Sequence, residues 1–229
     1  MAHPRFGDIG ACVFDAYGTL FDYNSAAARH AATLGDKAPA LAELWRLKQL
    51  QYTWLRSLMG RYAGFWQVTG EALDYSMAAL DVEDPALRDG LMDAYRTLDA
   101  YPEVPEMLAT LRAHGLKCAI LSNGEPGMLE SAVEAAGIAG SLDAVLSVDE
   151  VGIFKPHPSV YQLAVDRLGA PAARVSFQSS NAWDANGAAA FGFRVAWCNR
   201  FGQGPERVPE APDAEITTLA ELPALLGIG

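Results

Sequence analysis

The sequence predicts an α/β protein, in which a doubly wound parallel sheet carries an inserted all-helical cap. From residue 99 onwards, short apolar runs alternate with helical segments, which is βαβα order. A similar apolar run stands alone at Ala11–Phe14, and residues 22–98 follow it without a convincing strand. We therefore expect residues 1–21 and 99–229 to form a Rossmann-like core domain and residues 22–98 to form the cap.

Composition and charge exclude several classes of partner. The 229 residues are enough for one large domain or for one domain with a smaller insertion, and a composition of 51% hydrophobic and 20% charged residues is that of a globular protein with a core. The net charge of −11 opposes nucleic-acid binding, because no basic run could neutralise a phosphate backbone. Neither a membrane-spanning segment nor the apolar stretch of a signal peptide is recognisable, so no membrane partner is expected. Three cysteines without metal-binding spacing favour buried reduced thiols and a cytoplasmic protein.

The first apolar run, Ala11–Phe14, is typical of a buried strand of a parallel sheet. Asp15 follows it directly, and Gly18 and Thr19 mark a turn. Asp15 is therefore expected at the carboxyl edge of the sheet, where open α/β folds bind ligands. On this stretch alone, an aspartate that merely caps a turn is an equally good interpretation.

The cap is expected to contain three helices, at Leu41–Met59, Ala63–Leu80 and Pro85–Leu98. The first contains neither glycine nor proline and ends at Gly60. Pro85 suits the first turn of the third helix. The first helix carries an apolar stripe at nearly helical spacing, made of Leu44, Leu47, Leu50, Leu55 and Leu58.

After the cap, strands and helices alternate, and glycines end several of the helices. The expected helices are Val104–His114, Pro126–Ala136, Ser159–Leu168, Trp183–Gly192 and Leu219–Leu226. The expected strands are Leu116–Leu121, Asp143–Val148, Val175–Gln178, Arg194–Cys198 and an edge strand at Glu215–Thr218.

Polar side chains follow four of these strands, and the carboxyl ends of parallel strands meet at one edge of a sheet. Asp15 is a carboxylate that can act as a nucleophile, and Lys155 can stabilise its ionised form. Ser122 can hold an anionic group together with backbone N–H groups, and Asp184 can activate water. Taken singly, such residues are more often caps, turns or solvated loop residues. Their joint placement favours a site.

Four ordered segments then show a resemblance that covers nearly the whole chain. Residues 15–20 (DAYGTL), 122–124 (SNG), Lys155-Pro156 and 179–184 (SSNAWD) resemble the four motifs of the haloacid dehalogenase superfamily, and the position of the cap is similar too. Most members are magnesium-dependent phosphatases with a second acid two residues after the nucleophile. Here that position is Tyr17, and a halide leaving group needs no proton. The resemblance therefore favours L-2-haloacid dehalogenases (type II) over the alternative, a magnesium-dependent small-molecule phosphatase.

By that resemblance, Asp15 attacks C2 of an (S)-2-haloacid, Arg46 takes up the halide, and water activated by Asp184 hydrolyses the ester to an (R)-2-hydroxy acid. The resemblance implies no metal or other cofactor, and it implies that the protein forms a homodimer. Without the resemblance, Arg46 would be a surface arginine of an amphipathic helix. The implied catalytic residues are Asp15, Thr19, Arg46, Ser122, Asn123, Lys155, Tyr161, Ser179, Asn181 and Asp184. The implied substrate-binding residues are Ala16, Tyr17, Leu50, Phe65, Ser122, Asn123 and Trp183.

Two positions depart from the pattern of that family, Leu47 directly after Arg46 and Gln178 directly before Ser179. They bear on pocket polarity and leave the halide preference open. A binding or scaffold protein on the same fold is a third interpretation, because a fold does not by itself imply an activity. The complete set of polar residues at the strand ends argues against that interpretation.

Overall fold

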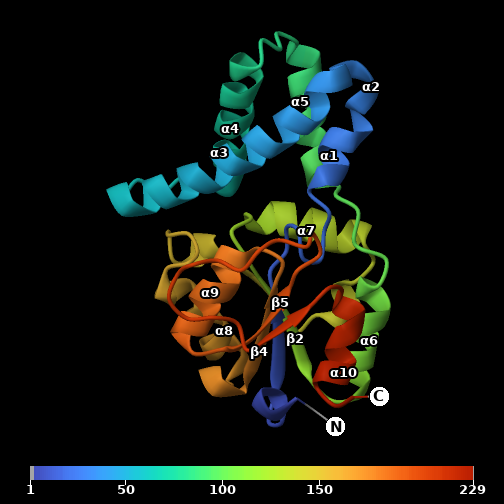
Figure 1. The fold of residues 1–229 in the computed structure, drawn as a ribbon, viewed down its shortest axis with the longest axis vertical. Coiled ribbons are helices and arrows are strands. Elements are labelled where there is room, and N and C mark those ends of the chain that lie inside the picture. The colour runs from blue at the N-terminus through green and yellow to red at the C-terminus, as the bar shows by residue number, and fades with distance from the viewer. Residues whose placement is uncertain (1–2, 229) are drawn as a thin grey trace.

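The computed structural model describes residues 3–228. Helices α1 to α5 gather at one end of the molecule, and a parallel sheet flanked by helices forms the other end (Figure 1). No helix within residues 3–228 combines the length and the hydrophobicity needed to cross a bilayer. The predicted fold class, a parallel α/β core with an inserted helical segment, is confirmed.

The sheet contains six strands in the order β3-β2-β1-β4-β5-β6, and all of its pairings are parallel. Phe14 at the end of β1 pairs with Ile120 on one side and Gln178 on the other. Strand order reverses between β1 and β4, so the crevice of this fold opens beside the end of β1. The strands are β1 Ala11–Phe14, β2 Lys117–Ser122, β3 Ala144–Ser147, β4 Val175–Ser179, β5 Arg194–Cys198 and β6 Ala214–Ile216.

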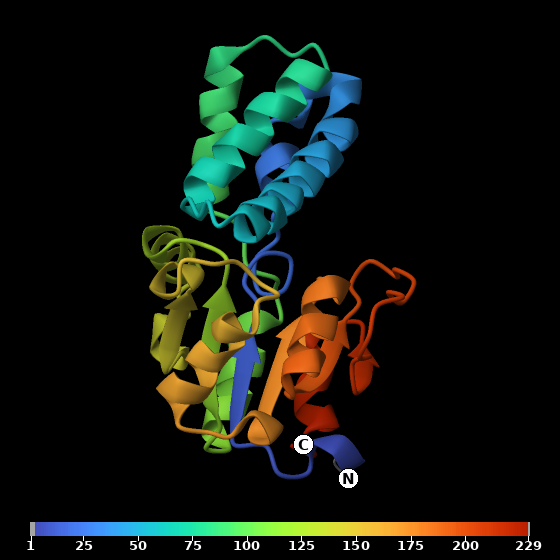
Figure 2. The same ribbon diagram turned by 90° about the vertical axis from the view of Figure 1, so that its left-hand side faces the viewer.

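Helices cover both faces of the sheet. Helices α6 and α10 lie on one face, and α8 and α9 lie on the other (Figures 1 and 2). Every residue of β1 is fully buried, as expected for a central parallel strand. Cys12, Cys118 and Cys198 are buried free thiols. The helices of this part are α6 Val104–Ala113, α7 Pro126–Ala135, α8 Pro158–Leu168, α9 Ala182–Phe191 and α10 Leu222–Leu225.

The segment expected to form the cap contains five α-helices rather than three. The predicted end of α3 is correct, because Gly60 N donates to the carbonyls of Arg56 and Ser57. The start of α5 is also as predicted, and the Asp84 side chain accepts a hydrogen bond from Leu87 N. Two short helices that precede α3 were not predicted. The helices are α1 Asn24–Arg29, α2 Ala31–Leu34, α3 Ala38–Met59, α4 Phe65–Ala79 and α5 Pro85–Arg96.

The predicted leucine stripe of α3 is not its buried face. Leu47, Leu55 and Leu58 are 56%, 43% and 84% exposed. The buried row of α3 instead has four-residue spacing and consists of Leu41, Trp45, Gln49 and Thr53. This row faces α4, where Trp45 Nε1 donates to the Thr69 carbonyl at 2.9 Å. The position of the neighbouring helix, which periodicity does not reveal, selects the buried row.

The two chain segments that connect the helices to the sheet lie side by side. Asp22 N donates to the Asp99 carbonyl at 2.8 Å, and Tyr101 N donates to the Leu20 carbonyl at 3.0 Å. These contacts support a division of the chain into residues 1–21 with 99–229 and residues 22–98, which stays a prediction.

Candidate active site

The nucleophile loop begins where β1 ends. Asp15 N donates to the Gln178 carbonyl at 2.9 Å, which extends the pairing of β1 with β4 by one step. Gly18 has a φ of +89°, and a Cβ there would lie 3.0 Å from the Tyr23 ring, so the tight turn favours glycine. The Ala16 carbonyl accepts from Leu20 N at 2.9 Å and closes the turn. The loop thereby returns the residue after Gly18 towards Asp15.

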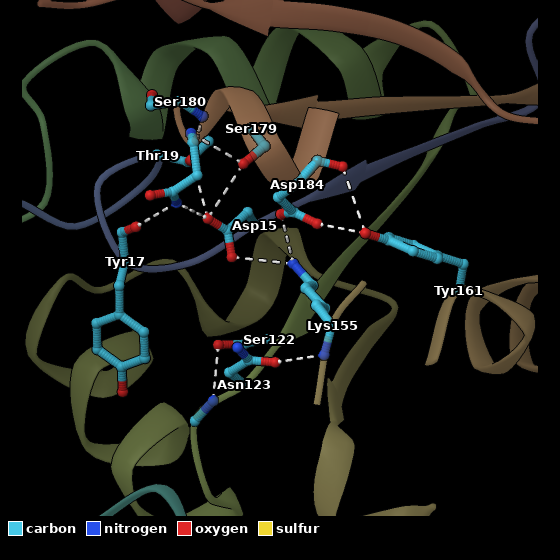
Figure 3. Close-up of polar contacts among 12 residues, drawn as sticks. Asp15, Tyr17, Thr19, Ser122, Asn123, Lys155, Tyr161, Ser179, Ser180 and Asp184 are labelled. Carbon is cyan, nitrogen blue, oxygen red and sulfur yellow. Dashed lines mark hydrogen bonds and ion pairs between the residues drawn. The ribbon is translucent and has the colours of Figure 1, made fainter. Parts of the chain in front are cut away.

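The Asp15 carboxylate is 6% exposed, and four side chains donate to it (Figure 3). Its Oδ2 accepts from Asn181 Nδ2 at 2.7 Å, from Ser179 Oγ at 3.3 Å and from Thr19 Oγ1 at 3.4 Å. Its Oδ1 accepts from Lys155 Nζ at 3.0 Å. The donors come from the loop after β1, the end of β4 and the loop before α8. The parallel topology thus brings three separate motifs to one carboxylate.

Lys155 lies between two carboxylates. Its Nζ is 2.8 Å from Asp184 Oδ2, and Tyr161 Oη donates to Asp184 Oδ1 at 2.7 Å. Burial disfavours the charged lysine, but the attraction of Asp15 and Asp184 outweighs it and raises the Lys155 pKa. Burial also raises the pKa of Asp184, with Lys155 opposing the shift and Asp15 adding to it. Burial raises the pKa of Tyr161, so its hydroxyl remains a neutral donor.

Ser122 and Asn123 occupy the end of the neighbouring strand β2, and both are buried. Ser122 Oγ accepts from Gly124 N at 3.0 Å, and Asn123 Oδ1 accepts from Lys155 N at 3.1 Å. The second contact fixes the orientation of the Asn123 amide and ties the β2 loop to the lysine loop. Figure 3 shows both side chains on the Lys155 side of Asp15.

From the helical segment, α3 contributes Arg46. Its Nη2 donates to Asn181 Oδ1 at 3.0 Å, and Asn181 in turn donates to Asp15. The guanidinium also lies over the Tyr23 ring, 4.8 Å from the centroid. Leu50, which we expected to bind substrate, is half-buried one turn further along α3.

The aromatic residues expected to line the pocket fall into two groups. Tyr17 and Phe65 lie together, with ring centroids 5.7 Å apart, and Tyr17 also stacks on Tyr95 at 5.5 Å. The Tyr17 ring points away from Asp15 (Figure 3). Trp183 instead packs edge-to-face against Trp54, with centroids 5.4 Å apart. Both indole N–H groups are buried donors without a hydrogen-bond partner among the described residues.

The sequence did not predict three residues that form a hydrogen-bonded group beside Arg46, namely Gln49, Thr69 and Tyr95. Gln49 Oε1 accepts from Arg46 Nη1 at 2.7 Å, and Gln49 Nε2 donates to Thr69 Oγ1 at 2.7 Å and to Tyr95 Oη at 3.1 Å. One signal was available, because Gln49 follows Leu41 and Trp45 at four-residue spacing. The side chains of the two residues that depart from the family pattern are not among these contacts of Arg46. Leu47 is exposed, and Gln178 Nε2 donates to Ser176 Oγ within β4.

The acidic groups of the site determine whether it offers ligands for a metal ion. Among residues 3–228, no three acidic, histidine or cysteine side chains gather into a metal-binding group. The lysine ammonium contacts both Asp15 and Asp184, so the carboxylate pair carries its counter-charge within the chain. At the position of the phosphatases' second acid stands Tyr17, whose ring faces Tyr95 and Phe65.

The doubly wound fold with a lysine-bridged carboxylate pair defines a class of hydrolases, and the sequence model of haloacid dehalogenase-like hydrolases matches residues 9–192. (S)-2-haloacid dehalogenase 1 of Pseudomonas sp. (strain CBS-3) is 49% identical, over 95% of this chain and 96% of the relative. (S)-2-haloacid dehalogenase 4A of Burkholderia cepacia is 48% identical, over 94% of each chain. The solved L-2-haloacid dehalogenase of Xanthobacter autotrophicus with chloropropionic acid covalently bound is 42% identical, with a TM-score of 0.89 and coverage of 96% and 98%. The chain belongs to the (S)-2-haloacid dehalogenase family.

Proposed function

We propose that this protein hydrolyses (S)-2-haloacids to (R)-2-hydroxy acids through an ester of Asp15, without a metal ion. The observation that carries the proposal is the unequal hydrogen bonding of the two Asp15 carboxylate oxygens. Three side chains donate to Oδ2, whereas Lys155 donates to Oδ1. The family names of the relatives support the substrate class. The covalently bound chloropropionic acid of the Xanthobacter autotrophicus enzyme supports a covalent intermediate.

In the first step, Oδ1 attacks C2 of the substrate. Oδ1 keeps a lone pair for attack because Lys155 is its one side-chain donor within residues 3–228, whereas three donors surround Oδ2. The bond between Oδ1 and C2 forms as the carbon–halogen bond breaks, and the configuration at C2 inverts. Ser122 and the backbone N–H groups of the nucleophile loop hold the substrate carboxylate.

The leaving halide gathers negative charge as the bond breaks, so donors at its position lower the barrier. Arg46 supplies a cationic fork of donors, and Asn123 supplies an amide. The rings of Phe65 and Trp183 offer positive edges and exclude water from the halide. Leu50, Ala16 and Tyr17 complete the apolar surroundings of the substrate.

In the second step, Asp184 takes a proton from water, and the oxygen of that water attacks Cγ of Asp15. A pKa raised by burial makes Asp184 a stronger base than an exposed carboxylate. Negative charge develops on Oδ2, where Asn181, Ser179 and Thr19 already donate. The bond between Cγ and Oδ1 breaks, and the hydroxy acid leaves with the proton from Asp184. The same donors thus orient the nucleophile and stabilise the second transition state.

A single turnover in ¹⁸O-labelled water, with enzyme in excess over L-2-chloropropionate, tests this mechanism. The proposal requires the label in the Asp15 carboxylate and unlabelled first product. Label that passes directly into the product would refute the ester intermediate. Halide release should survive EDTA, whereas magnesium-dependent activity confined to p-nitrophenyl phosphate would establish the phosphatase. A stable Asp15→Asn variant that matches wild type in every assay would instead identify a scaffold protein.

We also propose that the protein is a homodimer and acts in the cytoplasm. The exposed side chains of Leu58, Met59 and Tyr75 on α3 and α4 offer an apolar surface for a second copy. Three buried free thiols suit a reducing compartment. Light scattering of wild type and Leu58→Glu tests the first point, and a monomeric wild type would contradict it. Cell fractionation tests the second.

A further inference from the structure

Gln49 is a fully buried amide beside the proposed active site, and it has no place in the mechanism derived so far. Its side chain lies on the inner face of α3 and is 1% exposed. Four hydrogen bonds involve it, with Arg46, Thr69 and Tyr95 as partners. An amide costs free energy to bury unless its donors and acceptors are paired, and here both ends of the amide are paired.

Thr69 determines which way this amide points. Thr69 Oγ1 donates its proton to the Phe65 carbonyl at 2.7 Å, so towards Gln49 it can only accept. The NH2 end of Gln49 therefore faces Thr69, at 2.7 Å. The carbonyl end is left facing Arg46 Nη1, also at 2.7 Å. A backbone carbonyl of α4 thus fixes the orientation of an amide on α3.

The guanidinium of Arg46 is consequently held at two points. Gln49 accepts from Nη1, and Asn181 accepts from Nη2 at 3.0 Å while donating to Asp15. Because the guanidinium is planar, two such contacts set the direction of its remaining N–H groups. A neutral acceptor at Nη1 also leaves the positive charge of Arg46 uncompensated, which a carboxylate at the same place would not do.

We infer that Gln49 is a positioning residue, which orients Arg46 towards the halide that leaves C2 of the substrate. This inference rests on the proposed function. It further predicts that the contact matters for the step that breaks the carbon–halogen bond and not for hydrolysis of the ester. Asp184 and Lys155 lie outside the Gln49 contacts, and the bonds from Asn181 Nδ2 to Asp15 Oδ2 and to the Tyr17 carbonyl do not involve Gln49.

Single-turnover kinetics of Gln49→Met test the inference, with Gln51→Met as the matched control. Gln51 lies on the same helix, is exposed and contacts Lys48. Halide release and 2-hydroxy acid formation are followed separately with L-2-chloropropionate and L-2-iodopropionate. We expect halide release from the chloro substrate to fall about 10- to 100-fold, the range for loss of a hydrogen bond to a charged group. The loss should be smaller for iodide, which needs less stabilisation as it leaves, and ester hydrolysis should stay at the wild-type rate.

Two further variants keep the test decisive. Gln49→Glu retains an acceptor for Arg46, but its carboxylate neutralises the positive charge of the guanidinium. Halide release should therefore again be slowed, while ester hydrolysis stays at the wild-type rate. Thr69→Val removes the hydroxyl that orients the amide. We expect halide release to fall less than in Gln49→Met, and again to fall more for the chloro substrate than for the iodo substrate. This variant provides the test if Gln49→Met fails to fold. Equal losses in both steps, equal losses for both halides, or rates like those of Gln51→Met would overturn the inference. A wild type that releases no halide from any 2-haloacid would overturn the proposed function instead.

Discussion

Replacement of Lys155 by methionine removes the cation that two buried carboxylates share. Lys155 and Asp184 are 1% and 0% exposed, and Asp15 is 6% exposed, so water replaces the lost ammonium poorly. Removal of one partner from a buried ion pair costs about 3–5 kcal/mol of unfolding free energy. We expect a loss of that size at pH 8 and no release of halide or hydroxy acid.

The loss should depend on pH. Without Lys155, the folded-state pKa of Asp184 rises further above its value in the unfolded chain. A carboxyl group with a raised folded-state pKa supports the fold below its unfolded pKa and loses that support as pH rises through the folded pKa. Destabilisation of the variant should therefore grow from pH 4.5 to pH 8, with a slope of up to about 1.4 kcal/mol per pH unit for one proton.

In the wild type, Lys155 should not make the free energy of unfolding depend on pH between pH 4.5 and pH 8. The raised pKa of Lys155 keeps its contribution fully present below the unfolded lysine value, and it is lost only as pH rises through the higher folded-state pKa. Urea unfolding followed by circular dichroism measures both proteins. Lys48→Met, which removes a lysine whose Nζ bonds to Gln51 on the surface, is the control and should cost less than about 0.5 kcal/mol.

Asp184→Asn in the Lys155→Met background separates the two carboxylates. Because the amide cannot ionise, the double variant should regain stability at pH 8 and lose most of the pH dependence. A Lys155→Met loss that is the same at both pH values, or a double variant less stable than the single one at pH 8, would refute the assignment of the cost to an unpaired buried charge.

Four further predictions concern the site and its surroundings. Asp15→Asn should fold and release no halide, because an amide oxygen is a poor nucleophile; halide release at the wild-type rate would contradict this. Asp184→Asn should release one halide per site and then stop, with the mass of the ester on Asp15 visible by mass spectrometry. In the wild type, ester hydrolysis should fall in acid with an apparent pKa above the ordinary aspartate value, because burial raises the pKa of Asp184. Gly64→Ala should lower the free energy of unfolding by about 1–3 kcal/mol, because a Cβ there would collide with Glu125 Oε1, which accepts a hydrogen bond from Trp66 N. Equal stability of Gly64→Ala and wild type in urea unfolding would show that this contact is not rigid.

The core of the fold and the identity of the nucleophile could be predicted from the sequence. Strands of a parallel sheet are buried on both faces, so β1 and residues 118–121 of β2 are continuous apolar runs, whereas β4 is buried although Ser176 and Gln178 interrupt its apolar residues. Chain order and the right-handed crossover rule then put their carboxyl ends at one edge. Asp15 and Lys155 follow from this reasoning although 140 positions separate them, and the structure places Nζ 3.0 Å from Oδ1.

Tertiary structure alone decided the arrangement around Arg46. Leucine periodicity in α3 indicated one buried face, and α4 selected another, which places Gln49 in the interior and Leu58 in solvent. The orientation of the Gln49 amide depends on a threonine twenty positions away. Helix periodicity records only that a sequence has an apolar side, whereas the partner of each polar atom depends on distances between segments remote in the chain. For that reason the nucleophile was predictable from the ordered strand-end motifs taken together, and the residues that position Arg46 were not.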